Sequence, residues 1–394
     1  MEAYAFDWVQ LVIRWVHLIT GIAWIGASFY FVFLDNSLTP PARKEDADEG
    51  IGGELWAIHG GGFYHAMKYR VAPPALPETL HWFKWEAYWT WMSGFALLVV
   101  MYYAHADLYM IDRSVADVAP WQAIAISVAL LVAGWVFYDQ LCKRAGLDRE
   151  RVVAVAIIAF FALVAWGLSQ VFSGRAMFIQ VGAMMGTIMA WNVFFVIIPG
   201  QRKLVEAKAL NVAPDPVYGL RGKQRSVHNN YFTLPVLFIM ISNHYPMTFG
   251  YRHAWLLLIA ILLLAAYVRH FFNLRHRGRT VWAIPITAAI ATFVIAIAIA
   301  PEKPKAAAYT FADVQKIVAQ RCAPCHAAKP TQAGFNDPPK GVVLDTPEAI
   351  VTNAQKINEQ AVLTQAMPIG NLTGMTDAER AVLAGWLAAG APAR

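Results

Sequence analysis

Eight long apolar runs place the strongest constraint on what this chain can fold into. Each is long enough, at roughly 20 residues, for an α-helix to cross the hydrocarbon core of a bilayer. They cover residues of about 8–34, 84–104, 120–142, 152–172, 177–199, 227–246, 253–272 and 281–300. Hydrophobic residues make up 58% of the 394 residues and charged residues 15%, which excludes an ordinary soluble protein. The sequence predicts an all-α, polytopic membrane bundle of about eight transmembrane helices over residues 1–300.

A Cys-x-x-Cys-His motif follows the apolar runs, at Cys322, Cys325 and His326. Two thiols on one helical turn can each add to a haem vinyl group, and the adjacent imidazole is then the proximal iron ligand. A zinc knuckle would need a second pair of ligands, which a chain with three cysteines lacks. A thioredoxin-like dithiol would need a βαβ context. The motif therefore predicts one covalently attached haem c.

The polarity and length of residues 309–394 suit a small all-α cytochrome c domain. Pro301, Pro304 and the alanines at 306–308 predict a linker over residues 301–308.

The distal iron ligand is expected to be a methionine, because no histidine follows His326. Met367 lies in an irregular segment with Pro368 and is the predicted ligand; the alternative is an unligated core methionine. Met375 instead precedes a predicted helix N-cap at Thr376, with a capping-box glutamate three residues later and a helix running to about residue 389.

The membrane topology is predicted twice, from the haem and from charge. Haem is attached to c-type cytochromes outside the plasma membrane, so the cytochrome domain is expected there, and eight helices place the N-terminus on the same, periplasmic side. The predicted inner loops then hold seventeen Lys and Arg residues, against three in the outer loops, Arg113, Arg175 and Arg252. The net charge of +6 is thus a topology signal and not evidence for nucleic acid. The first helix lacks a basic n-region and a clear cleavage site, so a retained anchor is expected.

A histidine and an arginine within the first apolar run suggest a second haem. His17 lies roughly 14 Å along the helix from Trp8, near mid-bilayer, with Arg14 about one turn above it. The imidazole suits a haem b iron and the guanidinium suits a propionate. His244 is the candidate second ligand, with His105 as an alternative. The competing explanation is a histidine hydrogen-bonded between helices and an arginine that snorkels outward.

Three histidine-bearing segments are predicted to meet at the cytoplasmic face. One runs from His59 through three glycines to Phe63 and His65. The others hold Arg225, His228, Asn229, Asn230 and Tyr231, and Arg269 with His270. Such residues offer proton transfer, anion binding, amide contacts and aromatic stacking. Taken singly, each residue is better explained as an anchor of a helix end. Together they favour a site.

The order of these motifs resembles the bacterial membrane-bound urate oxidases, or urate hydroxylases, over essentially the whole chain. The resemblance implies oxidation of urate to 5-hydroxyisourate in the bacterial inner membrane. It also implies that electrons leave through the fused cytochrome c to the respiratory chain, with a soluble cytochrome c or a terminal oxidase as acceptor, without formation of hydrogen peroxide. The membrane part is more distantly similar to copper-resistance and protoporphyrinogen-oxidase membrane families, which supports a haem b on His17 by analogy alone.

A mechanism compatible with this resemblance assigns roles to the cytoplasmic residues. His59, His65 or His228 is the candidate base, Arg225 and Arg269 hold the anion, Asn229 and Asn230 contact the ring edge, and Phe63 or Tyr231 stacks on it. Because the cytochrome lies across the membrane, a haem b on His17 is needed as an intermediate carrier. Without it, the site is expected near the outer face, around Arg14, His105 and His244.

Two alternatives stay open. The first is a respiratory dehydrogenase for another small reduced substrate. The second is a membrane transporter or metal-handling protein that carries a cytochrome tail and shows no substrate-dependent haem reduction.

Overall fold

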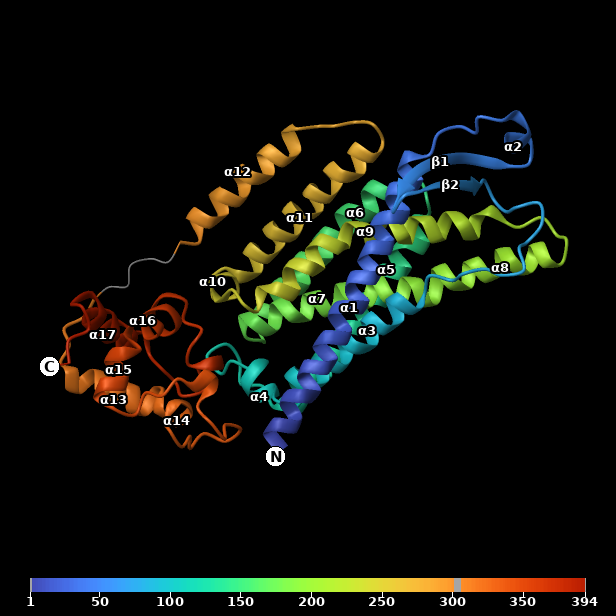
Figure 1. The fold of residues 1–394 in the computed structure, drawn as a ribbon. Coiled ribbons are helices and arrows are strands. Elements are labelled where there is room, and N and C mark those ends of the chain that lie inside the picture. The colour runs from blue at the N-terminus through green and yellow to red at the C-terminus, as the bar shows by residue number, and fades with distance from the viewer. Residues whose placement is uncertain (1, 301–305, 394) are drawn as a thin grey trace.

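The chain is described by a computed structural model that covers residues 2–300 and 306–393. Its two larger hydrophobic cores lie between residues 98 and 262 and between residues 314 and 386, and a small third cluster contains Ala87, Val193 and Ile198. Figure 1 shows a bundle of long helices, with a smaller group of short helices packed at one end. The predicted linker at 301–308 falls mostly on residues 301–305, which lie outside the described residues.

Long helical segments cover each of the eight predicted apolar runs. They are α1 (Glu2–Ser37), α3 (Trp85–Leu97) with the π-helix η1 (Leu98–Tyr103), α5 (Pro120–Ala145), α6 (Glu150–Ser169), α7 (Gly174–Asn192) with the π-helix η2 (Val193–Ile197) and α8 (Ile198–Ala209), α9 (Pro216–Ser242), α11 (Ala254–His276) and α12 (Ala283–Ala298).

Within the described residues, five helices are long and apolar enough to span a membrane: α1, α5, α6, the continuous α7–α8 segment and α11. Three segments fall short of that measure. The α12 helix is apolar but shorter, α3 gives way to η1 after 13 residues, and the first turns of α9 are basic. The chain is therefore mostly helical with several possible membrane spans, and a total of eight stays a prediction.

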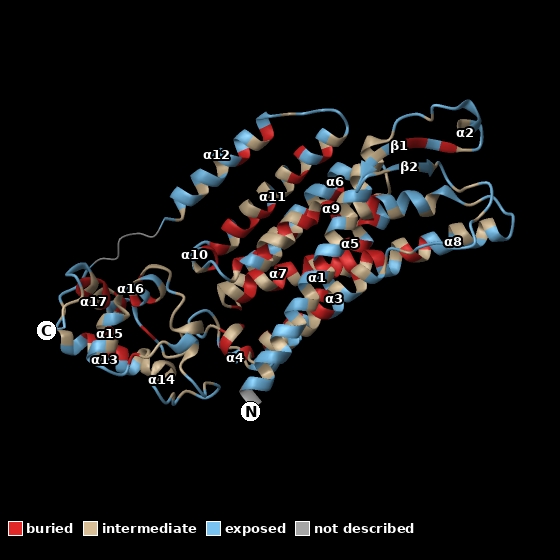
Figure 2. Cartoon of the chain, in the orientation of Figure 1, coloured by how far each residue is buried: buried red, intermediate tan, exposed pale blue. Residues whose placement is uncertain are grey.

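The bundle is built around α7. Most of its residues are buried, including Met177, Val181 and Met184, whereas α1 and α12 expose large apolar side chains such as Trp15 and Phe293 (Figure 2). Apolar side chains that face outward are stable where lipid surrounds the helices. The short helices α4 (Ala106–Tyr109) and α10 (Pro246–Phe249) lie at the end that carries the N-terminus and the smaller domain (Figure 1).

A β-hairpin forms at the opposite end, next to α2 (Lys44–Asp48), where the sequence predicted only a loop. Strand β1 (Ile51–His59) pairs antiparallel with β2 (Gly62–Tyr69). The connecting Gly60 and Gly61 have φ of 57° and 83°, which matches a type I′ turn. These glycines therefore serve the turn, and the all-α expectation omitted this element.

The smaller domain contains short helices around its own core. They are α13 (Phe311–Arg321), α14 (Ala323–His326), η3 (Pro339–Gly341), α15 (Pro347–Thr352), α16 (Ala354–Ile357), the π-helix η4 (Asn358–Leu363), η5 (Ile369–Asn371) and α17 (Asp377–Ala388). The predicted capping box at the start of α17 is confirmed: Thr376 Oγ1 accepts from the Glu379 amide, and the Glu379 carboxylate accepts from the Thr376 amide.

Candidate functional site

His228 lies at the centre of a hydrogen-bonded line that joins three helices. The Tyr138 hydroxyl, on α5, donates to His228 Nδ1 at 2.7 Å. His228 Nε2, on α9, then donates to Glu150 Oε2, on α6, at 3.0 Å. The line leads from a tyrosine that is 1% exposed to a carboxylate whose side chain is 49% exposed. The arrangement fixes the tautomer of His228 and places a basic imidazole between a proton donor and a charged partner.

Further buried polar groups contact Tyr138 or lie beside it. Asn192 Nδ2, at the end of α7, donates to the Tyr138 hydroxyl at 3.2 Å and to Asn229 Oδ1 at 3.0 Å. Arg225 Nη2 pairs with Asp139 Oδ1 at 2.9 Å, and both side chains are 3% exposed. The charge of Arg225 is therefore already compensated, which weakens its predicted role in holding an anionic substrate.

Arg269 lies in a different environment, between α1, α9 and α11. Its Nε donates to Asn230 Oδ1 at 2.8 Å, and its guanidinium carbon lies 3.9 Å from the centre of the Phe29 ring. Three buried atoms here have no hydrogen-bond partner among the described residues: Arg269 Nη2, Asn230 Nδ2 and Asn273 Oδ1. Buried polar atoms without partners are costly unless a ligand or water satisfies them.

A largely open, mostly apolar pocket of about 370 Å³ adjoins this cluster. It is lined by Phe29, Tyr30, Phe33, Leu234, Arg269, Phe272 and His276. The Nδ1 atom of His276 also lacks a partner among the described residues. Aromatic walls, a cation and an imidazole suit a planar anion, which stacks on rings and accepts hydrogen bonds from a guanidinium. We call this cavity with Asn230 and Asn273 the Arg269 cleft.

The predicted cytoplasmic cluster is thus divided between two faces of α9. Contacts toward α5, α6 and α7 involve Arg225, His228 and Asn229. Contacts toward α11 involve Asn230 and Tyr231, whose hydroxyl lies 2.7 Å from His270 Nδ1.

The hairpin histidines lie apart from both groups. His65 stacks on Trp56, with ring centres 4.1 Å apart, and its Nε2 lies 2.7 Å from Glu54 Oε2. His59 ends β1 at the turn, and Phe63 is 80% exposed on the other side of it. Within the described residues, no hydrogen bond or ring contact joins His59 or His65 to His228.

His17 packs between α1 and α3. Its Nδ1 donates to the Thr90 carbonyl at 3.0 Å, and the ring lies against Gly94, where an added Cβ would be 2.8 Å from Cε1. Donation from Nδ1 to a carbonyl leaves Nε2 with a lone pair, as in metal-ligating histidines, so His17 fits an axial ligand. Arg14 contacts Gln10 and the sulfur of Met101.

The structure does not assemble a second membrane ligand beside His17. His244 follows the end of α9 and is exposed, and His105 precedes α4, where it packs on Phe6.

The Cys-x-x-Cys-His segment has two free thiols and an imidazole with one nitrogen in a hydrogen bond. His326 Nδ1 donates to the Val342 carbonyl at 2.9 Å, which leaves Nε2 available to iron. Cys322 and Cys325 are unbridged, and burial raises the pKa of the Cys322 thiol to about 12. Met367 packs partly buried against the same core as Cys322. These residues fit a c-type haem.

Several site residues were absent from the sequence prediction. Tyr138, Asp139 and Asn192 are polar residues inside apolar runs, a signal that could have identified them. Glu150 and His276 lie at helix ends among many charged residues and carry no such signal.

The family model described as urate oxidase N-terminal matches residues 3–300. The chain is largely helical, and five helices of its described residues are long and apolar enough to span a membrane, which is consistent with membrane association. The chain belongs to the urate oxidase N-terminal family. This membership indicates a urate-related oxidation. No curated protein and no solved structure gives a significant match.

Proposed function

We propose that this chain is a membrane-bound urate oxidase that passes electrons from its helical bundle to a c-type haem in its C-terminal domain. The observation that carries the proposal is one chain in which a urate oxidase N-terminal region, residues 3–300, is followed by the Cys322–His326 motif. Cys322 and Cys325 would bind the haem, and His326 and Met367 would ligate its iron. A haem bound there supplies a one-electron acceptor.

The Arg269 cleft supports the choice of substrate. Urate is a planar anion that has carbonyl acceptors and N–H donors on its edges. Arg269 Nη2, Asn230 Nδ2 and Asn273 Oδ1 are buried and have no hydrogen-bond partner among the described residues, so two donors and one acceptor would be satisfied by a ligand that enters beside them. The neighbouring rings of Phe29 and Phe33 offer stacking surfaces. We assign urate to this cleft because no carboxylate of the described residues pairs with Arg269, in contrast to Arg225.

The reaction adds water to the ring of urate and releases two protons and two electrons, giving 5-hydroxyisourate. His276 lines the cleft with a free Nδ1 and is the proposed proton acceptor. His228 is the alternative base, because Tyr138 and Glu150 hold it in a fixed tautomer.

His17 is proposed to ligate a haem b between the cleft and the C-terminal domain, and its free Nε2 supports this. The proposed location is the bacterial inner membrane, with the C-terminal domain on the periplasmic side. A soluble cytochrome c or a terminal oxidase would then accept the electrons.

The proposal is tested by the source of the new oxygen atom. Membranes that contain the protein are expected to convert urate with incorporation of ¹⁸O from labelled water, and without hydrogen peroxide. Either incorporation of ¹⁸O from labelled dioxygen or formation of hydrogen peroxide in step with urate consumption would contradict it.

Site variants test the assignment of the cleft. Arg269→Met and His276→Asn should each lower urate turnover by about 100-fold or more, the usual loss for a binding cation or a base. His253→Asn, at an exposed position before α11, is the matched control. Loss of turnover in His228→Asn, with turnover retained in His276→Asn, would show that the base is misassigned.

A further inference from the structure

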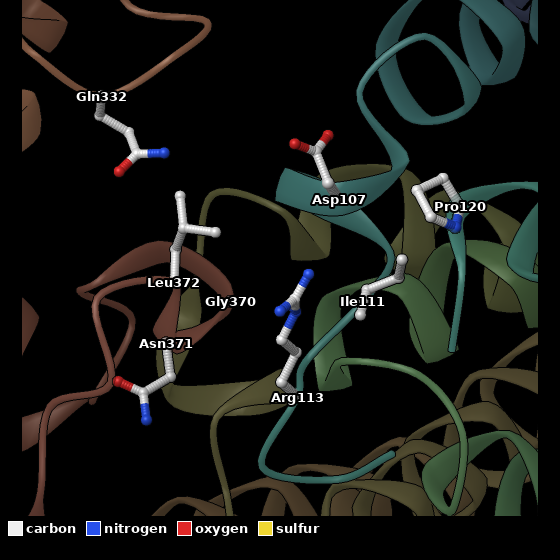
Figure 3. Close-up of a pocket in the computed structure, with 8 residues that line it drawn as sticks. All are labelled: Asp107, Ile111, Arg113, Pro120, Gln332, Gly370, Asn371 and Leu372. Atoms are coloured by element: carbon white, nitrogen blue, oxygen red, sulfur yellow. The ribbon is translucent and has the colours of Figure 1, made fainter. Parts of the chain in front are cut away.

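The two domains touch through backbone at Gly370 in η5. Gly370 has a φ of 55°, and an added Cβ would lie 2.9 Å from the Ile111 carbonyl oxygen and 3.3 Å from that of Leu108. Only glycine fits this approach without displacing the backbone that follows η1. Figure 3 shows Asp107 and Arg113 of the bundle and Leu372 of the smaller domain around a shared cavity of about 250 Å³.

The backbone at Gly250 makes a second close contact between the bundle and the smaller domain. An added Cβ at Gly250, directly after α10, would lie 2.6 Å from the Thr364 carbonyl oxygen. Gly334 also approaches Leu108, with 3.7 Å between an added Cβ and Leu108 Cδ1. Two close backbone approaches, at Gly370 and Gly250, and one ordinary side-chain contact, at Gly334, thus join the smaller domain to the end of the bundle.

The docked segment is rigidly joined to Met367. Only Pro368 separates Met367 from η5. The Met367 carbonyl accepts from Arg380 Nη1 at 2.9 Å, and Arg380 is 8% exposed. Asn371 accepts from the Met375 amide at 2.8 Å. The edge of the smaller domain that carries Met367 therefore faces the bundle.

On the bundle side, a row of aromatic rings leads toward this contact. Its ring centres are 5.6 Å apart for Trp135–Trp191, 5.8 Å for Trp191–Trp91, 5.5 Å for Trp91–Phe95 and 6.4 Å for Phe95–Tyr103. The row runs from α5 and α7 through α3 to Tyr103 in η1. Tyr102, the residue before Tyr103, forms a separate pair with Tyr109 in α4, with ring centres 6.0 Å apart, so η1 and the short helix that meets η5 are joined by this pair.

We propose that the contact between α4 and η5 is the electron-transfer junction between the two domains, reached along this aromatic row. The rate of electron tunnelling falls steeply with distance. Transfer between the domains is therefore favoured at the point where the two backbones touch. Each transfer oxidises the bundle by one electron and reduces the C-terminal domain by one, and no proton crosses the contact. The inference rests on the proposed function, because urate oxidation supplies the electrons.

Two glycine variants of the full-length, haem-loaded protein in detergent test the junction. Gly370→Ala places a methyl group against the Ile111 carbonyl. Gly374→Ala is the matched control, because Gly374 also has a positive φ, 67°, but its nearest neighbour is Arg321 Nη1 at 3.7 Å. Undocking replaces a fixed contact by a diffusive one, so anaerobic reduction of the c haem by urate should slow by about tenfold or more in Gly370→Ala only.

Amide hydrogen exchange over residues 106–111 provides a readout that needs no turnover. It should rise in Gly370→Ala and in the independent variant Gly250→Ala, and match the wild type in Gly374→Ala. If Gly370→Ala raises amide exchange over residues 106–111 but its c haem is still reduced at the wild-type rate, the contact is not the electron-transfer junction. Unchanged exchange in both docking variants would overturn the contact itself. Failure of urate to reduce the wild type would instead overturn the proposed function, and the inference with it.

Discussion

At the scale of residues, the two methionines after His326 lie in different surroundings. Met375 is 4% exposed inside the smaller core, whereas Met367 is only partly buried at its edge. Met367→Ala should remove the far-red charge-transfer band of a methionine-ligated haem and lower its reduction potential. Met375→Ala should keep the band but lower the free energy of unfolding by about 2–5 kcal/mol, because it leaves a core cavity. Absorption spectra, redox titration and thermal unfolding measure these effects; the reverse pattern would show that the distal ligand is Met375.

Residue types were easier to predict than their partners. Polar groups have a high free-energy cost in a bilayer, so His17 was predicted to be functional. The position of His228 at the start of an apolar run likewise suggested a site. The partners of His228 are Tyr138 and Glu150, which lie 90 and 78 positions away in the sequence. Such pairings depend on how α5, α6 and α9 pack, and helical periodicity carries no information about that. For the same reason the sequence grouped Arg225 with Arg269, although they contact different helices.

At the scale of elements, the hairpin carries a pH-dependent contact. A hydrogen bond from the Ala42 amide, followed by the contact with His65, holds the pKa of Glu54 below its usual range. A carboxyl group with a lowered folded pKa stabilises the fold above its unfolded pKa of about 4.3, and this stabilisation is lost as the pH falls through the folded value. Amide exchange over residues 51–69, corrected for intrinsic rates, should therefore rise as the pH falls below about 4.

Glu54→Gln is the control for this effect, because it removes the charge and keeps the shape. The pH dependence of exchange in the hairpin should disappear in this variant. An unchanged pH profile in Glu54→Gln would assign the effect to another group.

The long helices could be predicted because apolar runs encode them directly. The hairpin could not, because its three consecutive glycines suit a ligand-binding loop as well as a turn, and the pairing of β1 with β2 is a tertiary property. The π-helical segments η1 and η2 lie in continuous apolar runs and have no sequence signature there. The η2 segment directly follows Asn192, whose side chain donates to the Tyr138 hydroxyl, and π-helical turns often occur at functional sites.

At the scale of the whole molecule, the N-terminus and the smaller domain lie at one end of the bundle and the hairpin at the other (Figure 1). The excess of Lys and Arg in the hairpin-side loops predicts that this end faces the cytoplasm. In intact spheroplasts, a membrane-impermeant maleimide should label Lys329→Cys, on the exposed surface of the smaller domain, but label Phe63→Cys only after lysis. The buried Cys142 of the parent protein provides the background. Labelling of both positions before lysis would contradict the proposed topology.

Urate oxidation in the bundle is proposed to deliver electrons to a haem in the C-terminal domain. The most direct measurement is anaerobic absorption spectroscopy of the oxidised, purified protein in detergent, before and after addition of urate, with xanthine as the control substrate. We expect urate alone to reduce a c-type α-band, with a separate b-type band if His17 binds haem. A haem that dithionite reduces but urate does not would contradict the account.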